Sequence, residues 1–188
     1  LGEAGVLGGI VGQDRLTGKG RFNAKLNTRG NSVNAIKRAL GGNLDFRFDD
    51  GAVKGFNLGQ TIRQAKARFK GETLPQSKQP QQTDFSEMSG SAVISKGVLS
   101  NKDLLAKSPF LRVDGSGKVN LVQETLDYTV KAVIVNTEKG QGGEGLEELK
   151  GVPVPVHLTG ALASPGFKID WGQVLTGTQK AKLEEKKQ

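Results

Sequence analysis

His157 is the one histidine of the chain, so most acid–base or nucleophilic chemistry would depend on it. A serine–histidine–aspartate triad would need it as general base, yet neither a GxSxG elbow nor an HExxH helix occurs in the sequence. His157 stands at an outward position of an alternating segment, which favours a surface or sheet-edge histidine. Because there is also no cysteine, thiol catalysis, disulfides and thiolate metal sites are excluded.

Two carboxylate pairs and one glycine-rich stretch complete the residues that could do chemistry. Asp49–Asp50 and Glu147–Glu148 lie in turn or loop contexts, where solvated acids are usual. The stretch GQGGEG over residues 140–145 is not followed by the lysine and hydroxyl residue of a phosphate-binding loop. We therefore expect no catalytic residue, no metal and no cofactor, and a protein that is not an enzyme.

The net charge of +8 favours an anionic partner, such as nucleic acid or a phospholipid surface. Basic residues gather on one predicted helix and in the last ten residues. Nucleic-acid platforms interleave such charges with exposed aromatic rings, whereas the phenylalanines here occupy core-pattern positions. We expect no nucleic-acid partner.

The composition favours a single β-rich domain. A chain of 188 residues suits one sizeable core, and 27 glycines with only 5% aromatic residues suit short strands joined by tight turns. No apolar run is long enough to span a membrane. The start lacks methionine and a signal-peptide layout, so we expect a piece of a longer chain.

Two short amphipathic helices are predicted over residues 32–40 and 57–69. Ser32 and Asn57 are placed as N-caps. Apolar side chains recur at helical spacing after each cap: Val33, Ile36 and Leu40 in the first helix, and Leu58, Ile62, Ala65 and Phe69 in the second.

Alternating residues predict strands over most of the remaining chain. Asp49–Gly51 and residues 114–117 are predicted hairpin turns because Asp-Gly tolerates positive φ. Residues 71–82 and 136–150 are predicted flexible loops, and residues 178–188 a frayed or helical tail. Pro153 and Pro155 suggest that residues 152–158 form an edge strand. The predicted strands cover residues 20–28, 44–48, 83–95, 111–113, 118–122, 126–135, 152–158 and the region of Phe167 and Ile169.

The predicted sheet has one apolar face and only two short helices to cover it. Acyl chains are suited to such a face, since each buried methylene contributes about 0.8 kcal/mol. A core closed by its own helices is an equal alternative. Lys66 and Arg68 are candidates for headgroup phosphates. The candidate lipid-facing residues are Leu44, Phe46, Phe48, Val93, Val119, Leu121 and Val130.

Several motifs, in order, resemble the C-terminal region of the AsmA family. They lie in residues 42–66, 83–130 and 151–170. An Asp-Gly turn before a GxxL helix entry is matched by Asp50, Gly51, Gly55 and Leu58, and a TxFxx(L/M)xG strand by Thr83, Phe85, Met88 and Gly90. A GxGx(I/V)(D/N)L hairpin is matched by Gly115, Gly117, Val119, Asn120 and Leu121, and a closing PVx(L/I)xGxLxxP by Pro155, Val156, Leu158, Gly160, Leu162 and Pro165.

The resemblance implies a periplasmic domain of a protein anchored in the inner membrane by a segment absent from this sequence. It implies phospholipid transport between inner and outer membranes and a role in outer-membrane biogenesis. Phospholipid or another envelope lipid is then the expected partner, and no family motif designates a catalytic residue. The expected fold is α+β, mainly a curved antiparallel sheet with two short amphipathic helices, forming a single domain over residues 1–188.

A docking module of the envelope is the alternative function. In that case the domain would bind an envelope protein through an edge strand, without touching lipid. An open apolar concavity would favour the lipid function, and a sealed core with a bare edge strand would favour docking.

Overall fold

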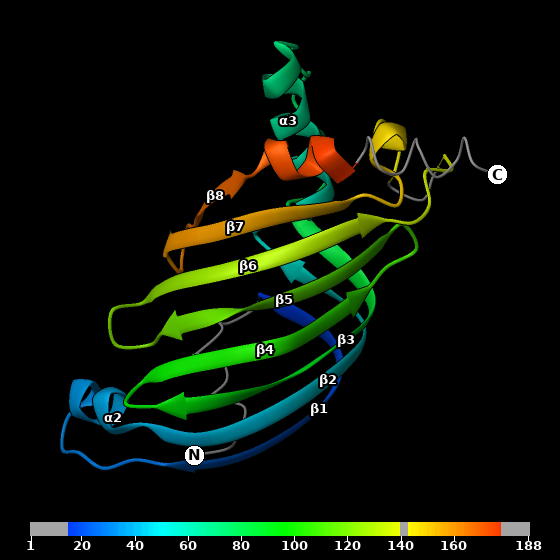
Figure 1. The fold of residues 1–188 in the computed structure, drawn as a ribbon. Helices are drawn as coiled ribbons and strands as arrows, with labels where there is room; N and C mark the ends of the chain where they lie inside the picture. The colour runs from blue at the N-terminus through cyan, green and yellow to red at the C-terminus, as the bar shows by residue number, and fades with distance from the viewer. Residues whose placement is uncertain (1–14, 140–142, 178–188) are drawn as a thin grey trace.

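The described strands form one open antiparallel sheet in which every strand pairs with its neighbours in the sequence (Figure 1). The computed structural model describes residues 15–139 and 143–177. This arrangement confirms that the chain is mainly an antiparallel sheet. The eight strands are β1 (Leu16–Asn27), β2 (Gly41–Lys54), β3 (Gln82–Ser95), β4 (Val98–Lys107), β5 (Leu111–Asn120), β6 (Thr125–Ile134), β7 (Pro153–Ala161) and β8 (Gly166–Ile169).

The helices begin where the capping residues predict. In α2 (Val33–Ala39) the Ser32 side chain accepts a hydrogen bond from the Ala35 amide, and no residue of the helix is buried. In α3 (Leu58–Lys70) the Asn57 side chain accepts from the Gln60 amide. A short 3-10 helix, η1 (Glu147–Leu149), and a helical segment at residues 171–177 complete the helical structure of the described chain.

The predicted hairpin turn at Asp49–Gly51 is wrong, because β2 continues through it. The register with β3 is the same at Asp49 and Gly51, on either side of the unpaired Asp50, while the register with β1 shifts by one residue at the same place. Asp50 has a φ of 50°, so the positive φ that Asp-Gly supplies is used in a β-bulge. Local sequence does not distinguish this bulge from a turn, since both make use of a residue with positive φ.

The predicted turn at residues 114–117 is also wrong, because β5 runs straight through its two glycines. Gly115 lies where a Cβ atom would come within 2.8 Å of the Tyr128 ring, so the glycine makes room for an aromatic side chain. The sequence analysis also missed β4. Its register shifts around Lys102 and Asp103 interrupt the alternation that marks a strand.

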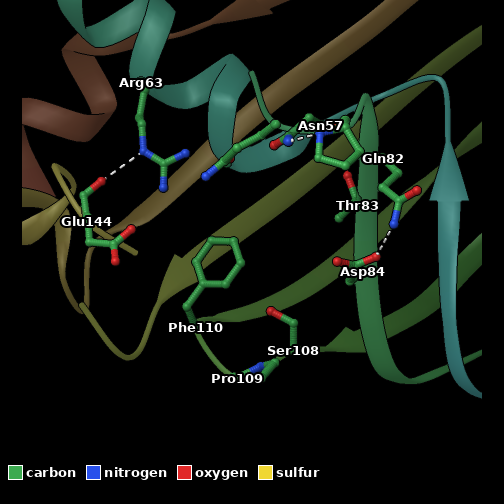
Figure 2. Close-up of a pocket in the computed structure, with 12 residues that line it drawn as sticks. Asn57, Arg63, Gln82, Thr83, Asp84, Ser108, Pro109, Phe110 and Glu144 are labelled. Atoms are coloured by element: carbon green, nitrogen blue, oxygen red, sulfur yellow. Dashed lines mark hydrogen bonds between the residues drawn. The ribbon is translucent and has the colours of Figure 1, made fainter. Parts of the chain in front are cut away.

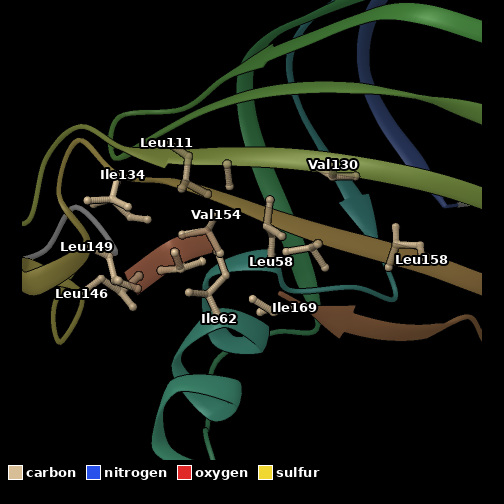
Figure 3. Packing of buried hydrophobic residues seen from close by; sticks show 14 residues of the cluster. Leu58, Ile62, Leu111, Val130, Ile134, Leu146, Leu149, Val154, Leu158 and Ile169 are labelled. Carbon is tan, nitrogen blue, oxygen red and sulfur yellow. The ribbon is translucent and has the colours of Figure 1, made fainter. Parts of the chain in front are cut away.

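The buried apolar residues form a large cluster and a small cluster. The large cluster lies between β5–β8 and the helical segments, with Leu58 and Ile62 of α3 packed against the sheet (Figure 3). Leu146 and Leu149 belong to it, so the predicted loop of residues 136–150 is anchored in the core at its C-terminal end. The small cluster, Leu44, Ala92 and Ile94, lies on β2 and β3.

The edge strands among the described residues are β1 and β8. β7 is not an edge strand as predicted, because β8 pairs with its residues Val156 to Thr159. The start of β1 meets the far side of the sheet, where Arg15 donates to the backbone carbonyls of Leu162 (3.3 Å) and Ala163 (3.0 Å) in the β7–β8 turn.

Residues 72–81 contain no helix or strand and are exposed, in agreement with their composition. The predicted tail, residues 178–188, lies outside the described residues. Within the described part of the chain, every helix is too short or too polar to cross a bilayer.

Replacing Ile62 with alanine tests the packing of α3 on the sheet. Ile62 is fully buried, so Ile62→Ala should lower the free energy of unfolding by about 2–5 kcal/mol, measured by urea denaturation. Val93→Ala is the control, because Val93 is 60% exposed and should change stability by less than about 0.5 kcal/mol. Similar losses for both variants would contradict the assigned core.

Candidate functional site

One face of the sheet is apolar from the first strand to the last. Directly paired residues of an antiparallel sheet point to the same face, so the register defines it. The side chains of four directly paired sets of residues lie on the apolar side of the sheet: Phe22–Phe46, Leu44–Ala92, Leu99–Val119 and Val130–Val156. We call it the apolar face. The other, outer face carries polar and charged residues such as Arg21, Asp45, Glu87, Lys118, Asp127 and His157.

Five of the seven candidate lipid-facing residues share the apolar face. Leu44 and Val130 are buried in the two clusters, and the other three are half-buried: Phe46, Phe48 and Val119. Val93 is a correction, because it pairs with Asn43 and Ser100 and lies 60% exposed on the outer face. Leu121 is buried in the turn beyond the end of β5 and is not a strand residue.

Glycines opposite Phe46 and Phe48 let the two rings lie on the sheet. A Cβ atom on Gly90 would stand 2.9 Å from the Phe46 ring, and one on Gly20 would stand 2.4 Å from the Phe48 ring. The two rings are neighbours, with centroids 6.0 Å apart. These phenylalanines are therefore packed against the backbone, which leaves them only partly available to a ligand.

An apolar cavity of about 230 Å³ opens on the same face, between α3 and the middle strands. Of the predicted lipid-facing residues, Val130 is the one that lines this cavity. Leu104 and Ala106 lie on β4, the strand that was not predicted. The side-chain alternation of β5, continued through Gly115 and Gly117, would have identified Val113. The apolar wall residues include Phe85, Met88, Leu104, Ala106, Leu111, Val113, Tyr128, Val130 and Leu158.

A polar network is embedded in the apolar face beside the cavity. Tyr128 donates its hydroxyl to Asn101 Oδ1, and Asn101 Nδ2 donates to the Ser91 carbonyl at 2.7 Å and to Asp103 at 3.0 Å. Burial, followed by the charge of Asp103, raises the pKa of the Tyr128 phenol, which therefore stays neutral. The network fixes the tyrosine ring as one wall of the cavity.

A polar pocket of about 580 Å³ adjoins the cavity and shares Thr83, Asp84 and Ser108 with it (Figure 2). The Arg63 side chain extends from α3 into this pocket, and its Nε donates to the Glu144 carbonyl at 2.8 Å. Burial lowers the pKa of Arg63, an effect that Glu144 and Glu147 oppose, and the guanidinium remains charged. The pocket thus combines one cation with the acids Asp84 and Glu144.

Lys66 and Arg68 lie on α3, outside the residues that line the polar pocket. Lys66 is only 17% exposed, donates to the Gly145 carbonyl at 3.1 Å and lies 3.5 Å from Glu148. Glu148 also accepts from Lys70 at 2.8 Å, which lowers the pKa of this carboxyl. Lys66 therefore holds the loop before η1, while Arg68 is exposed. The sequence analysis missed Arg63, the basic residue of this helix that does line a pocket.

His157 lies half-exposed on the outer face, with its Nε2 2.6 Å from Asp127 Oδ1. This position agrees with the predicted surface histidine. Over residues 15–139 and 143–177, no group of three or more histidine, aspartate and glutamate side chains is arranged to hold a metal.

The described chain is therefore a predominantly β domain, with one antiparallel sheet, a cavity on its apolar face and an adjoining polar pocket. The AsmA family matches residues 8–104 of the chain, and the chain belongs to this family. It is similar to "Protein AsmA" of Escherichia coli strain K12, with 25% identity over 162 residues that cover 85% of this chain. The chain spans about a quarter (26%) of the length of that relative. No solved structure matches it significantly.

Removal of the Tyr128 hydroxyl tests the polar network. Tyr128→Phe should cost about 1–3 kcal/mol of folding stability, because Asn101 Oδ1, on a buried side chain, loses its donor. Urea denaturation measures the change. A loss below about 0.5 kcal/mol would show that the network does not hold the ring.

Acid should weaken the same network through Asp103. Hydrogen bonds from Ser91, first from its hydroxyl and then from its amide, lower the pKa of Asp103 in the folded chain. This stabilisation is present above the unfolded-state pKa of about 3.9 and is lost as pH falls through the folded-state pKa. Thermal melts of Asp103→Asn over a pH series should show a smaller loss of stability on acidification than wild type. Identical pH profiles would contradict this role.

Proposed function

We propose that the chain is a non-enzymatic periplasmic part of an envelope protein that is anchored in the inner membrane by a segment outside this sequence. In this proposal the protein acts in phospholipid transport between inner and outer membranes and in outer-membrane biogenesis. The apolar sheet face contacts acyl chains. Family membership supports the setting, and the apolar cavity of about 230 Å³ is the single observation that carries the lipid contact.

The contacts of Arg15 support a curved sheet with the apolar face on its concave side. Neighbouring strands lie about 4.8 Å apart, so the two edges of a flat eight-stranded sheet would be separated by roughly 30 Å. The arginine before β1 nevertheless reaches Leu162 and Ala163 in the β7–β8 turn. A sheet that curls brings these ends together and turns the walls of the cavity toward one another.

The size of the cavity limits what it holds. Ligand pockets for whole small molecules usually measure about 300–1,000 Å³, so about 230 Å³ accommodates a segment of one acyl chain. Each methylene placed there contributes about 0.8 kcal/mol. The adjoining polar pocket is the place for a headgroup, where Arg63 faces a phosphate and Asp84 or Glu144 faces an ammonium group.

Filling the cavity tests the lipid contact. Ala106→Trp places a large ring among the cavity walls and should abolish co-purification of phospholipid, measured by native mass spectrometry of the gently extracted chain. Leu105→Trp is the matched control, since Leu105 is the next residue of β4 and lies 54% exposed on the outer face. It should retain lipid at the wild-type level.

Circular dichroism should show that both tryptophan variants are folded. Lipid retained equally by Ala106→Trp and Leu105→Trp, or no lipid on the wild-type chain, would contradict the proposal. Loss of lipid from the cavity variant alone would support it.

A docking module is the second candidate function, and β1 is the observation that favours it. This strand of 12 residues pairs only with β2 among the described strands, so its outer side offers backbone groups for strand addition. In this case the chain binds an envelope protein and not lipid. Full envelope function of Ala106→Trp in cells would favour docking.

A further inference from the structure

α2 presents apolar side chains to solvent on a helix that has no buried residue. Val33 is 70% exposed and Ile36 is 41% exposed. The two residues are three apart in a helix, so they lie on one face and form a stripe. The apolar pattern of this helix is therefore not accounted for by packing on the sheet.

The helix is held firmly to the sheet in spite of this exposure. Thr28 donates its hydroxyl to the Ile36 carbonyl at 2.6 Å, and Lys37 forms a 2.9 Å ion pair with Glu124 of the β5–β6 turn. The Gly97 amide of the β3–β4 turn donates to the Leu40 carbonyl at 2.9 Å. An isolated helix of this length is unstable in water, so α2 depends on these contacts. They also fix the orientation of the helix, in which Val33 and Ile36 face solvent at one end of the sheet.

All charged residues in the chain segment that carries α2 are basic. Residues 15–44 contain no aspartate or glutamate. Arg29 in the turn before α2 is exposed, whereas Arg38 lies on the side of the helix opposite the stripe. Lys96 in the adjoining β3–β4 turn adds a further exposed cation. The basic residues of the segment are Arg15, Lys19, Arg21, Lys25, Arg29, Lys37 and Arg38.

We propose that the α2 end of the sheet docks on an anionic phospholipid surface. Val33 and Ile36 enter the interfacial region, and Arg29 and Lys96 contact headgroup phosphates. Two exposed aliphatic side chains are too little for the core of a stable protein–protein interface, and an aromatic platform for nucleic-acid bases is absent from α2. A lipid surface needs only shallow apolar insertion together with positive charge.

This docking is a separate function from the acyl-chain cavity, and it also orients the sheet. Leu40, directly after α2, packs against the small cluster of Leu44, Ala92 and Ile94 on the apolar face. Contact through α2 therefore brings that end of the apolar face to the membrane. The cavity beside α3 lies elsewhere on the same face.

Vesicle flotation tests the docking surface. The chain should bind vesicles of phosphatidylglycerol and phosphatidylcholine, should bind pure phosphatidylcholine vesicles far more weakly, and should be released by salt. The stripe variant Val33→Ser/Ile36→Ser and the charge variant Arg29→Gln/Lys96→Gln should each bind the anionic vesicles roughly tenfold more weakly.

Matched controls use exposed residues of the outer face. Val93→Ser removes an aliphatic side chain whose exposure, 60%, lies between those of Val33 and Ile36. Lys118→Gln/Lys131→Gln removes two positive charges, as the charge variant does. Both controls should bind within about twofold of wild type. Ala106→Trp should bind vesicles normally, because the cavity lies apart from α2. Loss of lipid from the cavity and loss of vesicle binding through α2 are therefore measured by different variants.

Three results would overturn the proposal. The stripe and charge variants could bind vesicles as well as wild type does. The charge control could lose as much affinity as Arg29→Gln/Lys96→Gln, which would show binding by net charge alone. Alternatively, the wild-type chain could bind a soluble polyanion such as heparin and leave anionic vesicles unbound.

Discussion

The structure depends on one constraint, the burial of an apolar sheet face. Side chains alternate along each of the eight strands, so one face of the sheet is apolar and must be shielded from water. α3, η1 and residues 171–177 cover this face over β5–β8, where the large cluster lies. α2 covers none of it with a buried residue. Leu40, directly after α2, packs against the small cluster on β2 and β3.

The cavity and the polar network follow from this incomplete cover. At the border between the helix-covered half and the remainder, side chains of β3–β7 leave about 230 Å³ unfilled. Asn101 and Tyr128 would be costly in an apolar surface if they were unpaired, and they satisfy each other there. A bulged β4 brings Asp103 to the same network, so the irregular strand and the polar contacts form one feature.

Most elements could be predicted from the sequence, but the site could be predicted only in part. Ser32 and Asn57 determine the helix starts through local hydrogen bonds, and the strands that alternate cleanly were found. β4 is not recognisable from the sequence because its bulge breaks the alternation, and Asp50 and Gly115 have the residue types of turns although they lie within strands. Val93 was placed on the wrong face because the parity of a strand is set by its partners.

The sequence by itself determined the β-rich class, the helix caps, the cationic character of residues 15–44 and the resemblance to the AsmA family, because these depend on residue type and short spacing. Only the tertiary structure decided which face each strand residue shares, that Arg63 and not Lys66 lines a pocket, and that the stripe of α2 faces solvent. These properties depend on strand register and on contacts between residues far apart in the chain, which local patterns do not encode.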